Sequence, residues 1–298
     1  MPELPEVETM RRGLAGIVGR RVATLEFPRS RVRPISIAPR PTALAARVVG
    51  RTIAGAHRRG KRVVLELVTA ASQRLWLVVE PRMTGLFLVG APPSPEHVRM
   101  RIHLAGSGAP GSVLFWDRRG LGTIRLLDDR GLESACGSSV LGPDGLTVTG
   151  AELATALGRS RRAVKVALLD QRAVAGIGNI YAAEILFRAG IDPRTLCRRL
   201  AADDWERLAD RTRTVLAEAV RLEGSSIGDE TYRTTDNRPG RAQLRHRVYG
   251  RWDEPCRDCG TVVQRIVQAQ RSTFFCPTCQ VRPGALRRRG LATGARMP

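Results

Sequence analysis

Lysine is almost absent from this sequence. Lys61 and Lys165 are the only lysines, and the other 47 of the 49 basic residues are arginines. Such a bias is typical of a GC-rich genome, in which arginine replaces lysine wherever only the charge matters. A compact ammonium group can share or lose a proton, which a guanidinium group cannot do. Either the two lysines persist by chance or their chemistry is needed, so both positions are candidate functional sites.

The sequence also lacks a long apolar segment. No apolar run approaches the roughly 18 residues of a membrane-spanning helix. The acidic N-terminus contains no apolar stretch of the kind found in secretory signals. We therefore expect neither a membrane protein nor a secreted one, and a cytoplasmic location is the default. No internal repeat is visible.

Acidic residues are few, 28 against 49 basic residues, which gives a formal net charge of +21. Such an excess predicts a polyanionic partner, and nucleic acid is the first candidate. The 298 residues are enough for roughly two domains.

The N-terminal residues place a reactive amine beside a carboxyl group. Pro2 allows removal of the initiator methionine, which exposes a secondary amine, and Glu3 follows it directly. An α-amino group has a pKa of roughly 8, so part of it is a neutral nucleophile able to form a Schiff base. Pro5 fits the first position of a helix, whose positive end would favour the neutral amine. An ordinary helix start is the alternative. Apolar residues at helical spacing predict that one face of this helix is buried. They are Val7, Met10, Leu14, Ile17 and Val18.

Four of the six cysteines form two Cys-x-x-Cys pairs with 16 residues between them. The four are Cys256, Cys259, Cys276 and Cys279. This spacing predicts one structural zinc ion with four thiolate ligands and no open position for chemistry, while a disulfide pair is the alternative. Residues 262–263 and 272–275 look like short strands joined by a turn that carries Gln270 and Arg271. Cys136 and Cys197 are expected to be ordinary reduced residues.

The periodicity of the apolar residues changes along the chain. Between residues 20 and 127, alternating apolar residues and short turns predict an antiparallel sandwich or barrel, with a hairpin turn at 105–111. Residues 150–223 have helical periodicity, with Asp203 as a cap and Gly224 as a stop. Residues 224–243 look like a long mobile loop, and the tail after Gln280 is expected to be disordered. Strands are expected near 21–27, 62–68, 75–79, 98–104 and 113–116.

A glycine-rich loop precedes the helix expected at residues 180–188. In Gly176-Ile177-Gly178-Asn179, the free amides of a helix N-terminus could bind a phosphate, and the Asn179 side chain adds another donor. A simple turn between helices is the alternative.

Three stretches of the sequence closely resemble the bacterial formamidopyrimidine-DNA glycosylases. They are PELPEVET at 2–9, GIGNIYAAEILFRAGI at 176–191, and VYGR at 248–251 with QAQRSTFFC at 268–276. The resemblance is colinear over residues 1–281. It implies an α+β multidomain fold. Its parts would be an N-terminal antiparallel β-sandwich with a leading helix (1–135), a helix–two-turn–helix domain with a mobile lesion loop (145–245), a zinc ribbon (246–281) and a basic tail (282–298).

The resemblance implies a bifunctional DNA glycosylase and AP lyase that excises 8-oxoguanine and formamidopyrimidines from duplex DNA. Pro2 would attack C1′ of a nucleoside extruded from the duplex, and Glu3 would protonate the sugar ring oxygen. Strand cleavage by β,δ-elimination would follow from the Schiff base. Lys61 matches a family lysine that contacts phosphate and assists catalysis, and Glu6 matches a glutamate beside the active site. The family implies a monomer with damaged duplex DNA as partner, one zinc ion, and no redox or nucleotide cofactor.

Further matches imply a DNA-binding surface. Asn179 and Arg271 match residues that pinch the phosphates beside the lesion. Lys165 matches a lysine of the helical domain near the DNA. Met83 and Arg119 match two of the three residues that fill the void left by the extruded base.

The sequence departs from the family where the lesion is read. Leu121 replaces an aromatic wedge, so base stacking of roughly 1–3 kcal/mol would be lost. Glu80 stands where the family usually has a phosphate-binding histidine, and a carboxylate there repels phosphate unless an arginine neutralises it. Arg241 and Ala242 replace an aromatic pair in the lesion loop. These departures leave two alternatives open, which are a lyase for abasic sites or hydantoin lesions and a non-catalytic DNA-binding relative.

Overall fold

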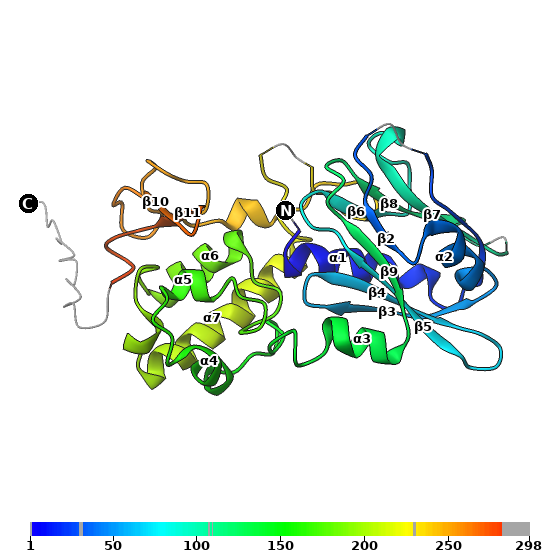
Figure 1. Ribbon diagram of the computed structural model, residues 1–298. Coiled ribbons are helices and arrows are strands. Elements are labelled where there is room, and N and C mark those ends of the chain that lie inside the picture. The colour runs from blue at the N-terminus through cyan, green and yellow to red at the C-terminus, as the bar shows by residue number, and fades with distance from the viewer. Residues whose placement is uncertain (1, 30–31, 107, 109, 229–230, 282–298) are drawn as a thin grey trace, which may run out of the picture.

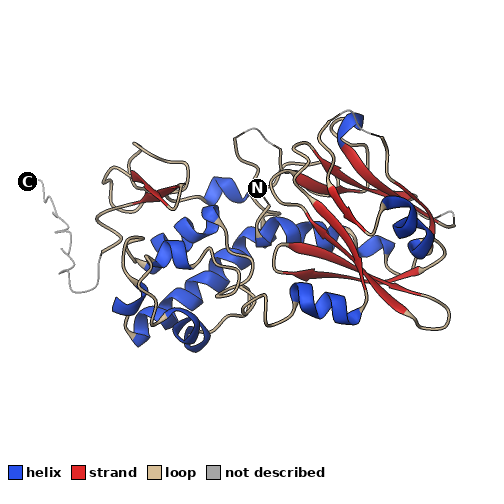
Figure 2. Ribbon diagram, viewed as in Figure 1, coloured by secondary structure: helices blue, strands red, loops and turns tan. Residues whose placement is uncertain are grey.

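The computed structural model describes residues 2–29, 32–106, 108, 110–228 and 231–281 (Figure 1). The chain has a strand-rich half and a helix-rich half, with a two-stranded ribbon beside the helices (Figure 2). The α+β class predicted from the sequence is confirmed. The tail that was expected to be disordered, residues 282–298, lies outside the described residues.

Two sheets in the N-terminal half share one hydrophobic core. Their strand orders are β1-β7-β8-β6 and β2-β9-β5-β4-β3. The strands are β1 (Val22–Glu26), β2 (Ser36–Ala38), β3 (Thr52–Arg59), β4 (Arg62–Val68), β5 (Arg74–Glu80), β6 (Gly85–Leu88), β7 (Val98–Leu104), β8 (Ser112–Asp117) and β9 (Thr123–Leu127). The five strands expected in this half of the chain are confirmed, to within one residue at either end.

One strand pair departs from the antiparallel pattern. The short edge strand β2 runs parallel to β9, whereas every other pair of named strands in the two sheets is antiparallel within the described residues. Antiparallel neighbours can be joined by a tight hairpin, but β2 is far from β9 in sequence and reaches it by a crossover. β7 and β8 pair antiparallel, as the hairpin predicted at 105–111 requires, and residues 107 and 109 of its turn lie outside the described residues.

Helix α1 (Leu4–Gly13) lies between the two halves of the molecule (Figure 1). Val7 faces the core of the sandwich, whereas Leu4 packs into the core of the helices. Pro5 occupies the second helical position rather than the predicted first, because the helix already begins at Leu4. Val18, predicted to be buried, is 42% exposed because the helix ends before it.

The helical half surrounds a second core. Two turns connect α5 to α6, which gives the expected helix–two-turn–helix arrangement. Asp203 is not the cap of α7. Ala201 is the cap residue, and its amide donates to the Asp204 carboxylate at 3.0 Å. The helices of the chain after α1 are α2 (Pro41–Val48), α3 (Asp129–Cys136), α4 (Gly150–Leu157), α5 (Val164–Ala167), α6 (Asn179–Ala189) and α7 (Ala202–Arg221), and single 3₁₀ turns lie at Ala15–Ile17, Pro95–His97, Cys197–Arg199 and Ala242–Arg245.

The C-terminal ribbon consists of β10 (Gln264–Gln268) and β11 (Arg271–Phe275). The first strand was predicted at 262–263, but Val262 forms only an isolated bridge with Pro255. The turn between the strands uses Ala269 and Gln270, both with positive φ, and Arg271 begins β11. Within the described ranges, no helix combines the length and apolar character needed to cross a bilayer.

Candidate active site

Glu3 is held at the N-terminal end of α6. Its carboxylate accepts hydrogen bonds of 2.9, 3.0 and 3.3 Å from the backbone amides of Gly178, Ile180 and Tyr181. The first amides of a helix have no partner inside the helix, and the positive end of the helix dipole favours a carboxylate. These amides are therefore not free for a phosphate, and that sequence prediction is wrong. The glycine loop instead fixes a carboxylate that is 1% exposed.

Gly178 is needed at this position because a side chain would collide with Glu3. A Cβ atom on Gly178 would lie 2.3 Å from Cδ of Glu3. We expect Gly178→Ala to lower the free energy of unfolding by about 1–3 kcal/mol, as overpacking of a buried site does. Urea unfolding followed by circular dichroism measures this. Gly16→Ala is the control, since its Cβ would meet nothing nearer than 3.7 Å; equal stability losses in the two variants would contradict the packing argument.

Glu6 lies next to Glu3 in a buried cluster of polar groups. Its carboxylate accepts hydrogen bonds from the Glu3 amide at 2.8 Å, the Tyr181 hydroxyl at 2.6 Å and the Ser225 amide at 2.8 Å. Burial, followed by the charge of Glu3, raises the pKa of Glu6. Tyr181 and Ser225 were missed by sequence reasoning, because they lie 175 and 219 residues from Glu6 and no local pattern links them.

Pro2 and Lys61 line one cavity of about 210 Å³ together with Arg271 from the ribbon. Lys61 lies in the turn between β3 and β4. Burial lowers its pKa, opposed chiefly by the nearby Glu3 carboxylate. The structure thus brings together two residues from the sandwich half and one from the far end of the chain. Gly178, whose amide donates to the Glu3 carboxylate, lines the same cavity. A buried N-terminal segment and a lysine therefore lie beside a fixed carboxylate, which is suited to amine-based covalent chemistry.

The Glu80 carboxylate also lines this cavity. It lies 3.4 Å from Nε of Arg62 and 3.2 Å from Nε of Arg82. A carboxylate at this position was expected to repel phosphate unless an arginine neutralises it. Two arginines, Arg62 and Arg82, do so.

Lys165 is buried and holds the side chain of Asn179 by a hydrogen bond. The Lys165 side chain is 0% exposed, and its Nζ donates to Oδ1 of Asn179 at 2.6 Å. Nδ2 of Asn179 donates in turn to the carbonyl oxygen of Ser272 in β11 at 3.1 Å. Burial, followed by the charge of Arg271, lowers the pKa of Lys165 to about 8. Lys165 therefore links α5, α6 and the ribbon.

A second cavity, of about 610 Å³, is lined by Glu3, Met83, Asn179 and Arg271. Arg119 and Leu121 do not line it. They lie on the neighbouring loop after β8, where Arg119 is exposed and Leu121 is half-buried.

Asp117 organises the two loops that carry Met83 and Leu121. Its carboxylate accepts from the Thr84 hydroxyl and from the Gly122 amide at 2.8 Å. The Arg119 amide donates to Oγ1 of Thr84 at 2.9 Å. A single buried carboxylate therefore fixes both loops to each other.

The predicted lesion loop is described except for residues 229 and 230. Its described part is anchored to the sandwich half. Tyr232 is buried in the sandwich core, and the Thr235 carbonyl oxygen accepts from the Val89 amide at 2.9 Å. Ala242, one of the two departures from the family within this loop, is buried in the helical core.

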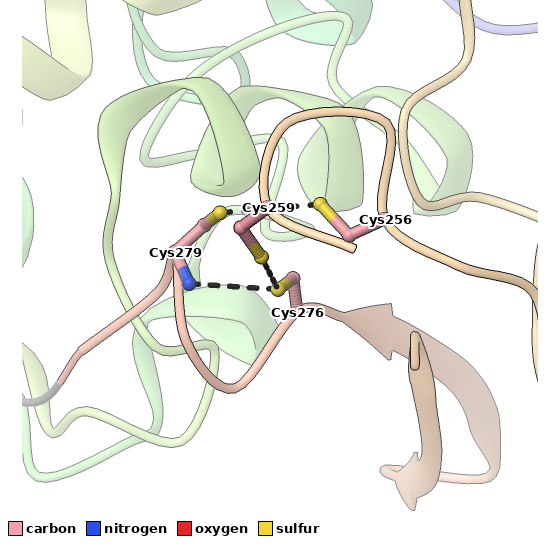
Figure 3. Close-up of side chains that lie close together, drawn as sticks. All are labelled: Cys256, Cys259, Cys276 and Cys279. Carbon is pink, nitrogen blue, oxygen red and sulfur yellow. Dashed lines mark hydrogen bonds between the residues drawn. The ribbon is translucent and has the colours of Figure 1, made fainter. Parts of the chain in front are cut away.

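The four ribbon cysteines are arranged for one metal ion (Figure 3). Their sulfur atoms all lie within 4.8 Å of one another, with Cys259 and Cys276 3.4 Å apart and Cys256 and Cys279 3.9 Å apart. A tetrahedral zinc ion with bonds of about 2.3 Å requires sulfur separations of about 3.8 Å, so the four thiolates fit zinc. Such a site is closed and structural, as predicted.

Three family models match successive parts of the chain. The model of the formamidopyrimidine-DNA glycosylase N-terminal domain matches residues 1–124, and that of the H2TH domain of the same glycosylase matches residues 141–231. A zinc finger found in FPG and IleRS matches residues 253–281.

Whole proteins agree with these models. The formamidopyrimidine-DNA glycosylase of Solibacter usitatus is 39% identical over 282 residues, which cover 95% of this chain and 100% of that protein. The glycosylase of the same name from Chloroflexus aggregans is 41% identical over 291 residues, covering 94% and 99%. The crystal structure of MutM (Fpg) from Thermus thermophilus has a TM-score of 0.80 at 38% identity, covering 94% and 98%. Lactococcus lactis Fpg in complex with DNA containing an abasic site has a TM-score of 0.80 at 31% identity, covering 93% and 99%.

Proposed function

The chain belongs to the formamidopyrimidine-DNA glycosylase family, and from this membership we propose how its own residues remove a damaged base. The protein is a bifunctional DNA glycosylase and AP lyase that acts on damaged duplex DNA and excises oxidised purines. The observation that carries the assignment of residues is the cavity that joins Pro2, Lys61 and Arg271 beside the fixed Glu3 carboxylate.

Pro2 is the nucleophile in this proposal. As the mature N-terminus, its neutral secondary amine attacks C1′ of the extruded nucleoside, and the glycosidic bond breaks as the base leaves. Pro2 precedes Glu3, the N-cap residue of α1, and the positive end of that helix disfavours a protonated amine.

Glu3 supplies the proton in this proposal. It protonates the sugar ring oxygen as the ring opens to the Schiff base. Oε1 accepts one hydrogen bond, from Ile180, so a lone pair remains that can hold the proton to be transferred. Glu6, which accepts from the Glu3 amide, acts as a positioning residue for Glu3.

The Schiff base then acidifies the C2′ proton. Its removal breaks the C3′–oxygen bond, and a second elimination releases the 5′ phosphate. We assign Lys61 to contact with the phosphate and to assistance in these proton transfers, because it lies in the same cavity.

The DNA-binding roles are proposals of the same kind. Arg271 and Asn179 contact the phosphates beside the lesion, supported by their position on a shared cavity, and Lys165 orients Asn179 from below. Met83, with Arg119 and Leu121 on the neighbouring loop, fills the void in the duplex. We also propose three domains, at residues 1–135, 145–245 and 246–281. We propose a cytoplasmic location because the relatives named above are bacterial proteins.

A pH titration tests the assignment of Lys165. Because its pKa is lowered to about 8, the free protein loses this charge as the pH rises through that value, and affinity for DNA falls. We expect Lys165→Met to bind more weakly at neutral pH and to lack this step. Binding of a duplex that carries a tetrahydrofuran abasic analogue, measured from roughly pH 7 to 9, reports it. An identical pH step in the variant would refute the assignment.

The second candidate is a lyase specialised for abasic sites or hydantoin lesions, favoured by Leu121 and by Arg241-Ala242 in the lesion loop. Single-turnover rates on duplexes with 8-oxoguanine, a formamidopyrimidine, a hydantoin or an abasic site decide between the two. Excision of 8-oxoguanine opposite cytosine at a rate similar to that of the formamidopyrimidine supports the first. Cleavage of the abasic duplex with no excision of either purine supports the second.

A further inference from the structure

We propose that Glu80 and Arg82 form a phosphate-binding element on the rim of the cavity that contains Pro2, in which Glu80 aims the Arg82 guanidinium and Arg62 balances the Glu80 charge. The ligand is a phosphodiester of the DNA backbone. The proposal rests on the proposed function, because it takes a nucleotide sugar to occupy the cavity.

The Glu80 carboxylate lies between arginines from two different segments. Glu80 is the last residue of β5, Arg62 is the first residue of β4, and Arg82 lies in the turn after β5. The side chains of Glu80 and Arg62 are each 18% exposed. Nε of Arg62 is buried and, in the part of the chain that the structure describes, has no hydrogen-bond partner. Its ion pair with Glu80 is therefore what compensates its burial.

Arg82 is the arginine of this cluster that faces outward. Its side chain is 55% exposed, and the contact with the Glu80 carboxylate runs through Nε, at 3.2 Å. A guanidinium that meets a carboxylate through Nε can present the edge formed by its two terminal nitrogens for a bidentate contact with phosphate. The backbone of Arg82 has a φ of 57°, a conformation that persists only where the surroundings hold it.

The position of the cluster identifies the phosphate. Arg82 and Glu80 line the same cavity as Pro2, Lys61 and Arg271. A sugar whose C1′ reaches Pro2 carries a phosphate on each side, so the rim of this cavity is where the DNA backbone passes. Two guanidinium groups and one carboxylate leave a single positive charge on the cluster, which attracts the backbone despite Glu80.

Binding as a function of salt concentration tests this inference, with a duplex carrying tetrahydrofuran as the probe. We expect Arg82→Gln to weaken binding about tenfold and to reduce the slope of log K against log salt by about 0.9. Glu80→Gln is also expected to weaken binding several-fold, although it removes a negative charge from a DNA-facing rim. In the Arg82→Gln background, Glu80→Gln should instead strengthen binding, because only its repulsion of phosphate is then left.

Control variants distinguish the orientation of the Arg82 guanidinium from its charge and from general effects on the protein. Arg47→Gln should leave the slope unchanged, because Arg47 is exposed on α2, a helix on the side of the sandwich away from the helical half (Figure 1). Arg82→Lys keeps the charge but loses the planar fork, so it should retain the slope and lose part of the affinity. Tighter binding by Glu80→Gln than by the parent, or an unchanged slope for Arg82→Gln, overturns the inference. A parent protein that gives no borohydride adduct with abasic DNA overturns the proposed function instead.

Discussion

Replacing Glu3 by glutamine is expected to lower the single-turnover rate of base excision by a factor of about 10²–10⁴, the usual contribution of a positioned general acid. Glutamine cannot donate a proton as a carboxylic acid does. It also cannot accept all three amide hydrogen bonds, since its NH₂ group would face an N–H of the α6 terminus. An unpaired buried amide costs about 1–3 kcal/mol, so stability should fall as well.

The experiment must separate these two effects. Rates are measured on a duplex with 8-oxoguanine opposite cytosine, under conditions in which thermal unfolding shows the variant to be folded. Glu206→Gln, an exposed position on α7, is the control for loss of one acidic charge. A smaller loss is expected on a preformed abasic duplex, because the base has already left. Excision by Glu3→Gln at the parent rate would refute the role of Glu3.

Loss of the metal should have the second large effect. We expect Cys259→Ser to lower zinc content and to weaken binding of the tetrahydrofuran duplex by about tenfold or more. Without the metal, the β10–β11 hairpin loses its support. Arg271 then leaves the cavity, and Asn179 loses the Ser272 carbonyl oxygen that holds it.

Zinc analysis by atomic emission and a binding titration on the same sample measure both effects. Cys136→Ala is the matched control, since Cys136 lies in a separate cluster in the sandwich half and should leave one zinc ion per chain. Normal DNA affinity in a zinc-free Cys259→Ser protein would contradict a structural role of the ribbon in binding.

Features set by local spacing could be predicted from the sequence. Cys256, Cys259, Cys276 and Cys279 form a four-ligand cluster because each Cys-x-x-Cys pair turns two sulfurs toward the same point. The strands followed from alternating apolar residues, and the scarcity of lysine drew attention to Lys61 and Lys165.

Partners that meet only through the fold could not be predicted. Glu3 and Gly178 lie 175 residues apart, so no local pattern indicated that this carboxylate, rather than a phosphate, binds the helix terminus. Lys165 is buried and donates to Asn179, 14 residues further along the chain, and no pattern in the sequence linked the two side chains. The prediction of Asp203 as the helix cap was wrong for a local reason. The neighbouring Asp204 carboxylate accepts the hydrogen bond from the Ala201 amide at this helix terminus.

In the proposed mechanism, the amine of Pro2 attacks the damaged nucleoside. The most direct test is to mix the protein with a duplex carrying 8-oxoguanine opposite cytosine in borohydride, digest the product, and locate the DNA adduct by mass spectrometry. We expect a covalent adduct on an N-terminal peptide that begins at Pro2. An adduct on Lys61, or base excision with no adduct at all, would contradict it.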